Sequence, residues 1–261
     1  MRGNFHTHSI YSDGEDTLEE LVQAAIALDC KALGFSEHSY TYFDESYCLS
    51  LANTPKYQAE VRALQAKYAA KIKLYLGIEQ DFYSSERSDE YEYIIGSVHY
   101  VKKNGDFLAI DESADDLVRF RDEYYDGDIY ALIEDYFKTV GMWAERKCDI
   151  IGHFDLITKF NEKYPLFDTA HPRYEIAAQS ALDKLLAAGK IIEINTGAMA
   201  RGWRMIPYPE SKWLDEIAEK NGRLILSSDC HTKNALLFDF ADERLKKYEK
   251  YFVDFPVKNT H

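Results

Sequence analysis

Short apolar, β-rich runs recur along this chain and alternate with longer amphipathic segments. Seven such runs are present, starting with GNFHTH (3–8) and KALGFSEH (31–38) and ending with GRLILSSDCH (222–231). The segments between them place apolar residues every three or four positions, as an α-helix with one buried face does. Nearly continuous apolar strands alternating with helices predict a parallel sheet covered on its outside. Seven such units around one core predict an α/β barrel similar to the TIM barrel.

The other four predicted strands and the five predicted helices complete this alternation. No linker rich in Pro, Gly or Ser interrupts it, and the length suits one α/β barrel. We therefore expect residues 1–261 to form a single domain. The four strands occupy residues 72–82, 93–101, 148–156 and 190–198, and the helices occupy residues 17–29, 54–70, 129–147, 172–189 and 209–222.

Composition and charge exclude several classes of function. With 46% hydrophobic and 29% charged residues the chain is typical of a globular enzyme. Its formal charge of −14 opposes binding to nucleic acid and to anionic membranes. No long apolar run or signal peptide is seen, so a cytoplasmic location is expected. Four cysteines without a C-x-x-C pair predict reduced, packed thiols.

Histidines and carboxylates gather where the predicted strands end. The carboxyl ends of barrel strands meet at one mouth, so these side chains should converge there. Crowding these side chains together without a metal would cost free energy, because their charges would be buried and unpaired. Histidine and carboxylate groups are, however, the ligands that divalent metals require. A metal site is therefore predicted, whereas His171 and His261 are expected to be exposed. The strand-end residues are His6 and His8, Glu37 and His38, Glu79, His99, His153, Asn195, and Asp229 with His231.

The spacing of the first and last motifs supports this prediction. In His6-Thr7-His8 the period of two in a strand sends both imidazoles to one side. The same alternation in Asp229-Cys230-His231 turns Cys230 away, which excludes it as a ligand. The SDG turn that follows His8 would bring Asp13 toward the mouth of the barrel, with Gly14 supplying backbone freedom. A turn or helix-capping role for Asp13 stays open.

Taken together, these motifs resemble the PHP (polymerase and histidinol phosphatase) superfamily. The resemblance rests on HTH followed by SDG, EH at 37–38, GSVH at 96–99, GHFD at 152–155 and SDCH at 228–231. It spans nearly the whole chain. Within the superfamily, GIEQDF, IDES and EINTGA are most similar to the small bacterial histidinol-phosphate phosphatases.

The resemblance implies a distorted seven-stranded barrel with two to three divalent ions of Zn, Mn or Fe. Glu37 would orient a ligand histidine, with a plainer structural role at the strand end as the alternative. Carried over by position, the first ion would be held by His6, His8, Glu79 and Asp229, the second by Glu79, His99 and His153, and the third by Asp13, His38 and His231.

The function implied is hydrolysis of L-histidinol phosphate, a step of histidine biosynthesis, by a hydroxide that bridges two metals. Catalysis would depend on Glu79, His99 and Asp229. The phosphate would be held by Lys159, Arg201 and Arg204, for which ordinary surface charge is the alternative. The substrate would lie between acidic and aromatic walls, for whose residues a solvated turn or helix cap is the alternative. The walls comprise Tyr40, Tyr42, Asp44 and Glu45 and also Asp111, Glu112, Asp115 and Asp116.

Other functions stay open at this point. One alternative is another PHP phosphoesterase, acting on a phosphodiester, a nucleotide or phosphotyrosine. A second is a non-catalytic metal-binding PHP module, although the complete ligand set favours catalysis. A metal-dependent amide or urea hydrolase is more distant, because no metal-bridging lysine is apparent. The expected partner is a small phosphomonoester, without nucleic acid or membrane.

Overall fold

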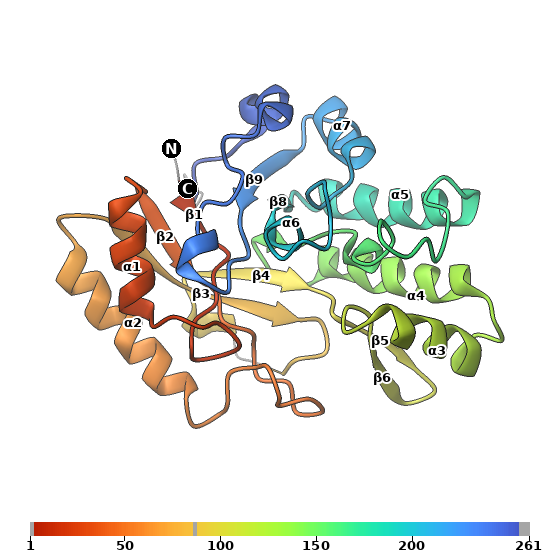
Figure 1. The fold of residues 1–261 in the computed structure, drawn as a ribbon, viewed down its shortest axis with the longest axis horizontal. Helices are drawn as coiled ribbons and strands as arrows, with labels where there is room; N and C mark the ends of the chain where they lie inside the picture. Colours follow the sequence, from red (N-terminus) through yellow and green to blue (C-terminus); the bar gives the residue numbers. More distant parts are fainter. Residues whose placement is uncertain (1–2, 86–87, 256–261) are drawn as a thin grey trace.

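The computed structural model describes residues 3–85 and 88–255, and its centre is a parallel seven-stranded sheet curled into a barrel (Figure 1). The barrel closes where Thr7 bridges Cys230 and the His8 amide donates to the Cys230 carbonyl at 2.9 Å. The predicted α/β barrel with seven strands is confirmed. In spatial order the strands are β1 (Gly3–Asn4), β2 (Ala32–Phe35), β3 (Lys73–Asp81), β4 (Tyr93–Ser97), β7 (Ile150–Ile151), β8 (Ile191–Asn195) and β9 (Arg223–Ser227).

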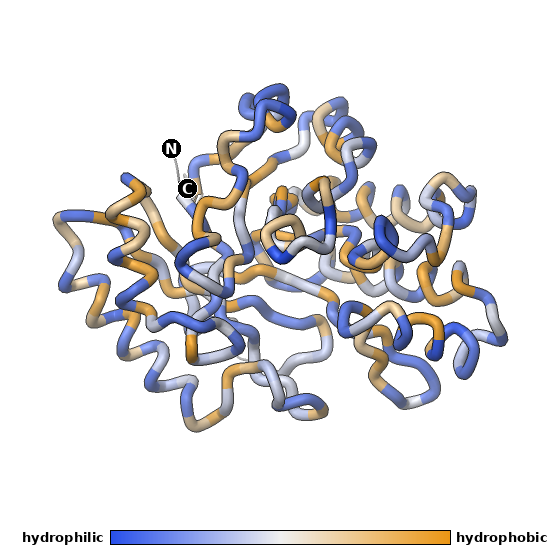
Figure 2. Tube along the Cα trace, viewed as in Figure 1, coloured by the Kyte–Doolittle hydropathy of each residue, from blue (hydrophilic) through white to orange (hydrophobic). Residues whose placement is uncertain are grey.

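All five predicted helices are present in the structure. Thr17 caps the first of them, since its hydroxyl accepts from the Glu20 amide while the Glu20 carboxylate accepts from the Thr17 amide. Figure 2 shows hydrophobic and hydrophilic residues alternating along α1 and α2, as expected for helices with one buried face. The helices are α1 (Leu18–Ala27), α2 (Thr54–Tyr68), α4 (Ile129–Gly141), α5 (Pro172–Ala187) and α7 (Ser211–Glu219).

The fourth predicted strand, residues 93–101, is two separate elements in the structure. β4 ends at Ser97, and β5 (Tyr100–Lys103) pairs instead with β6 (Asp106–Ala109) in an antiparallel hairpin. Asn104 and Gly105, at the turn, both have positive φ, which the Asn-Gly dipeptide tolerates. The break places His99 between the barrel and the hairpin, where its amide donates to Asp81 Oδ2 at 3.0 Å.

Further elements lie outside the predicted alternation. The acidic segment after β6 becomes a helix, α3 (Ala114–Tyr124), because the Ser113 hydroxyl caps it by accepting from the Asp116 amide. The remaining short elements are α6 (Gly197–Ala200), η1 (Ser88–Glu90), η2 (Met142–Glu145), η3 (Leu156–Thr158), η4 (Lys233–Ala235) and η5 (Glu243–Tyr251).

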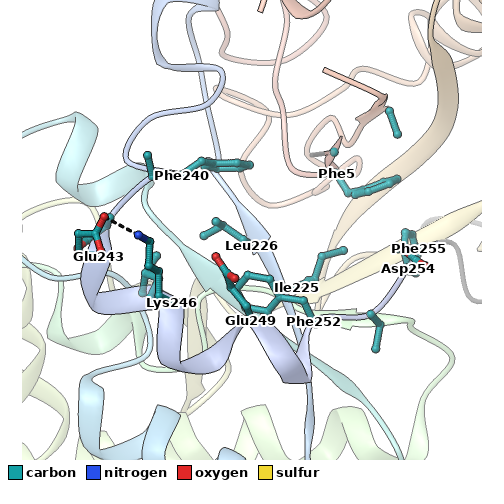
Figure 3. A pocket seen from close by; sticks show the side chains of 16 residues that line it. Phe5, Ile225, Leu226, Phe240, Glu243, Lys246, Glu249, Phe252, Asp254 and Phe255 are labelled. Carbon is teal, nitrogen blue, oxygen red and sulfur yellow. Dashed lines mark hydrogen bonds and ion pairs between the residues drawn. The ribbon is translucent and has the colours of Figure 1, made fainter. Parts of the chain in front are cut away.

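The C-terminal part lies against the barrel beside β9. Phe252 forms a parallel bridge with Leu224, and the Val253 amide donates to the Leu224 carbonyl at 3.0 Å. A cavity of about 600 Å³ opens here, lined by aromatic side chains such as Phe5 and Phe252 and by charged ones such as Lys246 and Glu249 (Figure 3). None of the histidines at the strand ends lines this cavity.

Several smaller expectations can be settled as well. All four cysteines are buried thiols without a disulfide, and Cys230 packs in the core as predicted. The expectation that His171 is exposed was wrong: it is half-buried, stacks on Tyr130 at 3.9 Å between ring centroids, and caps α5. His261 lies outside the described residues. No helix within residues 3–85 and 88–255 has the length and apolarity needed to cross a bilayer.

Tyr93 lies in an apolar layer with Phe5, Ile95 and neighbouring strand residues. Its hydroxyl donates to the carbonyls of Phe5 (2.7 Å) and Phe35 (3.0 Å). Its ring lies where a Cβ on Gly34 or Gly77 would be, within 2.3 Å and 2.2 Å of the nearest atoms. Glycine at both positions is therefore what allows the largest residue of this apolar layer to fit.

We expect Gly77→Ala to lower the free energy of unfolding by about 1–3 kcal/mol, because the added methyl overpacks the barrel against Tyr93. Urea denaturation measures this loss. The Gly77→Ala/Tyr93→Leu double variant should lose less than the sum of the two single variants, since shortening Tyr93 makes the space. Additive losses would contradict this packing assignment.

Candidate metal centre

Six histidines meet at the carboxyl end of the barrel, starting with the pair that opens the sequence. His6 and His8 are fully buried, with ring centroids 5.2 Å apart, on either side of the bridge that closes the barrel. Thr7 points the other way, and its hydroxyl donates to the Gly34 carbonyl at 2.9 Å. The strand period therefore delivers both imidazoles to the interior, as predicted.

The Glu79 carboxylate lies at the centre of this cluster. Its Oε2 is 2.8 Å from His38 Nδ1 and 3.2 Å from His6 Nε2. Its Oε1 is 2.9 Å from His153 Nε2 and also accepts from the Ser97 hydroxyl at 2.6 Å. Two further imidazoles, His8 and His99, have ring nitrogens at 3.5 Å and 3.4 Å from this carboxylate.

Asp229 closes the cluster on the side of β9. Its Oδ1 lies 3.2 Å from His8 Nε2, and its Oδ2 lies 3.1 Å from Arg201 Nη2. Its backbone is in the left-handed region, with φ of 47°, which Asp tolerates better than most residues. Gly197 is needed opposite, because a Cβ there would lie 2.8 Å from Asp229 Oδ2.

The turn after β1 brings Asp13 to the same mouth. Its Oδ2 is 3.1 Å from His231 Nε2, and its Oδ1 is 3.5 Å from His38 Nε2. Gly14 has no positive φ, contrary to the expected backbone freedom. Glycine is required here because the turn packs closely against the β1 segment: a Cβ at position 14 would lie 2.5 Å from the carbonyl of His8.

Glu37 holds this turn rather than a ligand histidine, which corrects the role expected for it. Its carboxylate accepts from the Ser9 amide at 3.1 Å, from the Ser9 hydroxyl at 2.6 Å and from the Ser12 hydroxyl. Glu37 is fully buried, and burial raises its pKa despite these hydrogen bonds. It therefore fixes the loop on which Asp13 lies.

Crowding shifts the pKa values of these groups in opposite directions. Burial, together with His38 and His231, lowers the pKa of His8 to about 3. Burial also acts to lower the pKa of His38, but Asp13 and Glu79 raise it to about 10. Burial acts to raise the pKa of Glu79, yet the surrounding imidazoles hold it well below its ordinary value. Carboxylate and imidazole charges are thus strongly interdependent.

Several buried polar atoms of the cluster have no hydrogen-bond partner among the residues that the structure describes. Buried nitrogen and oxygen atoms are ordinarily paired, so unpaired ring nitrogens and a carboxylate oxygen within one cluster fit a site that binds a cation. The donor set of imidazole and carboxylate suits a borderline divalent metal. The atoms are His6 Nε2, both ring nitrogens of His8, Glu79 Oε2, His99 Nδ1 and His153 Nδ1.

All nine predicted ligands are brought together, although the closest groupings differ from the expected partition. Three sets have ligand atoms within 4.8 Å of one another: His8 with Asp13, His38 and His231; His6 with His8 and Glu79; and His38 with Glu79 and His99. His8, His38 and Glu79 are each shared between two of the sets. His153 and Asp229 adjoin them through Glu79 and His8.

Sequence reasoning missed the residues that orient these ligands. Glu193 Oε1 lies 2.7 Å from His6 Nδ1, and its Oε2 accepts from the His153 amide at 3.0 Å. Asp81 accepts from the His99 amide. Both acids lie two residues from a polar strand-end residue, Glu193 before Asn195 and Asp81 after Glu79. The period of two was therefore the signal that could have identified them.

The mouth itself is a cavity of about 250 Å³. Two of the three predicted phosphate-binding cations, Lys159 and Arg201, line it. Lys159 Nζ donates to the Asp111 carbonyl at 2.6 Å, and Arg201 Nη1 donates to the Asp229 carbonyl at 3.0 Å. Arg204, the third predicted phosphate-binding cation, is 3% exposed and is not one of the described residues lining this cavity.

The predicted substrate walls are present only in part. Asp44, Asp111 and Glu112 line the mouth with Tyr47 and Tyr100. Among the described lining residues, Tyr40 and Tyr42 are absent. The Tyr40 hydroxyl donates to Glu45 at 2.9 Å, and Tyr42 packs against Phe43 and Phe107 outside the mouth. Asp115 and Asp116 are taken up in the first turn of α3.

We expect Glu193→Gln to weaken zinc binding about 10–100-fold, because it removes the carboxylate that orients His6 and His153. Competition with a chromophoric chelator measures this affinity. Glu134→Gln is the matched control, since Glu134 pairs with Arg173 on the outer helices. Equal zinc affinity in all three proteins would show that Glu193 does not support the centre.

Comparison with known proteins places this fold and site in a family. The PHP domain family matches residues 4–197. A Deinococcus radiodurans protein named "Probable histidinol-phosphatase" is 31% identical over 91% of this chain and 89% of its own length.

Two crystal structures share the fold. A Listeria monocytogenes protein matches with a TM-score of 0.79 and 20% identity, over 92% of this chain and 99% of that one. Histidinol phosphate phosphatase from Lactococcus lactis, complexed with zinc, L-histidinol and phosphate, matches with a TM-score of 0.72 and 20% identity, over 97% and 95% of the two chains. On the extent of the family match and of the Deinococcus relative, this chain belongs to the PHP domain family.

Proposed function

We propose that this protein is a metal-dependent phosphomonoesterase that hydrolyses L-histidinol phosphate to L-histidinol and phosphate. The observation that carries the proposal is one small cavity where part of the histidine and carboxylate cluster meets Lys159 and Arg201. The members of the cluster that line it are Asp13, His38, His99, His153, Asp229 and His231. The name of the Deinococcus relative supports the choice of substrate.

The balance of charge in the mouth explains why cations are required. Five carboxylates line it, those of Asp13, Asp44, Asp111, Glu112 and Asp229, against the two permanent cations Lys159 and Arg201. With the imidazoles neutral, as metal ligands are, a phosphate dianion would be repelled by this surface unless the ions supplied further positive charge. We propose that His6, His8, Asp13, His38, Glu79, His99, His153, Asp229 and His231 hold two to three divalent ions there.

When bound, the ions would supply positive charge to the phosphoryl oxygens and activate water for attack at phosphorus. The protein's own groups would position the substrate. Lys159 and Arg201 lie on the segments that follow β7 and β8 and would pair with phosphoryl oxygens. The Asp111 contacts of Lys159 and the Asp229 contacts of Arg201 hold both cations in place before the substrate arrives.

The leaving group would lie toward the acidic and aromatic side of the mouth. Asp44 accepts from the Tyr100 hydroxyl at 2.7 Å, and Glu112 and Tyr47 line the same side. The ammonium and imidazole of histidinol would be attracted by the carboxylates and could stack on the rings. A cavity of about 250 Å³ also favours a small ester over a nucleotide or a phosphopeptide.

We expect metal-replete protein to contain more than one divalent ion per chain and to lose activity when a chelator removes them. His99→Asn should lower kcat at least about a hundredfold with the fold retained, as disruption of a principal electrostatic element does. His171→Asn is the matched control, because His171 lies on Tyr130 outside the site. Elemental analysis of an active preparation that showed one ion or none would contradict the proposed centre.

We expect L-histidinol phosphate to be hydrolysed with kcat/KM at least about a hundredfold above propyl phosphate, the effect of two added contacts of about 1.4 kcal/mol each. Asp44→Asn and Glu112→Gln should each reduce this preference while leaving propyl phosphate hydrolysis unchanged. Glu45→Gln is the control, since Glu45 pairs with Tyr40 away from the mouth.

A panel including a nucleotide monophosphate, a phosphodiester and a phosphotyrosine peptide tests the substrate class. If any of these has a higher kcat/KM than L-histidinol phosphate, the substrate assignment is wrong. The metal centre would then serve a different phosphoesterase reaction.

A further inference from the structure

Arg204 is a buried cation that the proposed reaction does not use directly. It follows α6 in the loop between β8 and α7, and it is 3% exposed. Burying a guanidinium is costly, so it persists only where charges and hydrogen bonds compensate. Burial acts to lower the pKa of Arg204, but Asp155, Tyr208 and Glu210 raise it above its ordinary value.

The contacts of Arg204 join two separate segments of the chain. Its Nη1 donates to the Thr158 hydroxyl, and its Nε lies 3.4 Å from Glu162 Oε1. These partners belong to the segment after β7. On the other side, its guanidinium lies over the ring of Tyr208, 4.3 Å from the centroid, and 3.9 Å from the Glu210 carboxylate. Those partners belong to its own loop after β8.

The same two segments carry the two cations of the mouth. Thr158 directly precedes Lys159, and Arg201 is three residues before Arg204. Both segments are anchored to the barrel close by. Tyr208 pairs with Asn195 at the end of β8 through backbone hydrogen bonds of 2.8 Å and 3.0 Å. The Thr158 hydroxyl donates to the Asp155 carbonyl at 2.7 Å, two residues beyond His153.

We propose that Arg204 is a positioning residue that sets the spacing between Lys159 and Arg201 and thereby the affinity of the mouth for a phosphoryl group. It acts through Thr158 on one segment and through its own loop on the other. This role requires the planar guanidinium of Arg204, whose several N–H groups point in different directions, because a lysine ammonium cannot contact both segments in one fixed geometry. The inference rests on the proposed function, which requires that phosphate bind in this cavity.

Isothermal titration calorimetry of metal-loaded protein with inorganic phosphate tests the proposal without turnover. We expect Arg204→Lys to raise the Kd for phosphate at least about tenfold while bound zinc, measured by elemental analysis, is unchanged. In steady-state assays KM should rise by a similar factor, and kcat should change less than about threefold. Thr158→Val, which removes the acceptor hydroxyl at nearly constant shape, should shift Kd in the same direction by less.

Arg173→Lys is the matched control for loss of a forked arginine. Arg173 binds Glu134 and Asp128 with Nη and Nε contacts of 2.7–2.9 Å, but it joins α5 to α4 and its neighbouring turn rather than the two mouth segments. Its variant should lose thermal stability and keep the phosphate Kd within about twofold of the parent protein.

Parent-like phosphate affinity in Arg204→Lys would overturn the proposal, and so would an equal loss of affinity in Arg173→Lys. If Arg204→Lys does not fold, Thr158→Val decides by the same criterion. Phosphate binding by the parent protein without hydrolysis of L-histidinol phosphate would refute the proposed substrate and leave the role of Arg204 intact. Absence of phosphate binding in the parent protein would refute both.

Discussion

A single buried carboxylate, that of Glu79, organises the mouth of this barrel. Five imidazoles have ring nitrogens within 3.5 Å of it, and they come from the ends of β1, β2, β4 and β7. An isolated carboxylate at 1% exposure would be prohibitively costly, so the positive partners and the acid require one another. A divalent ion would bind the carboxylate and the imidazoles together, since it would be coordinated by the Glu79 oxygen and the ring nitrogens that lack hydrogen-bond partners.

Support for this cluster comes from acids and glycines that never face the mouth. Glu193 and Asp81 orient imidazoles, and Glu37 fixes the turn that presents Asp13. Gly14 and Gly197 supply space rather than flexibility, because a methyl at either position would overlap the backbone of His8 or the carboxylate of Asp229. The geometry of the centre is thus set by packing as much as by its ligands.

The part of the mouth that carries Lys159 and Arg201 is also supported by a residue behind it, Arg204. Arg204 lies in the loop after β8, yet it contacts the segment after β7, so two neighbouring βα units share one buried charge. Such a contact allows Lys159 and Arg201 to face one cavity from different loops. The larger cavity beside β9 lies apart from this centre, since the strand-end histidines do not line it.

The sequence by itself determined the seven-stranded barrel and the convergence of nine histidine and carboxylate side chains. Both follow from local periodicity: two in a strand, 3.6 in a helix, and one shared end for parallel strands. It could not show that residues 93–101 divide at His99, nor that Arg204, Tyr40 and Tyr42 avoid the mouth. Those outcomes depend on partners distant in sequence, such as Asp81 for His99, Thr158 for Arg204 and Phe107 for Tyr42. Only the tertiary structure decides which of several charged loop residues finds a buried partner and which is left facing the cavity.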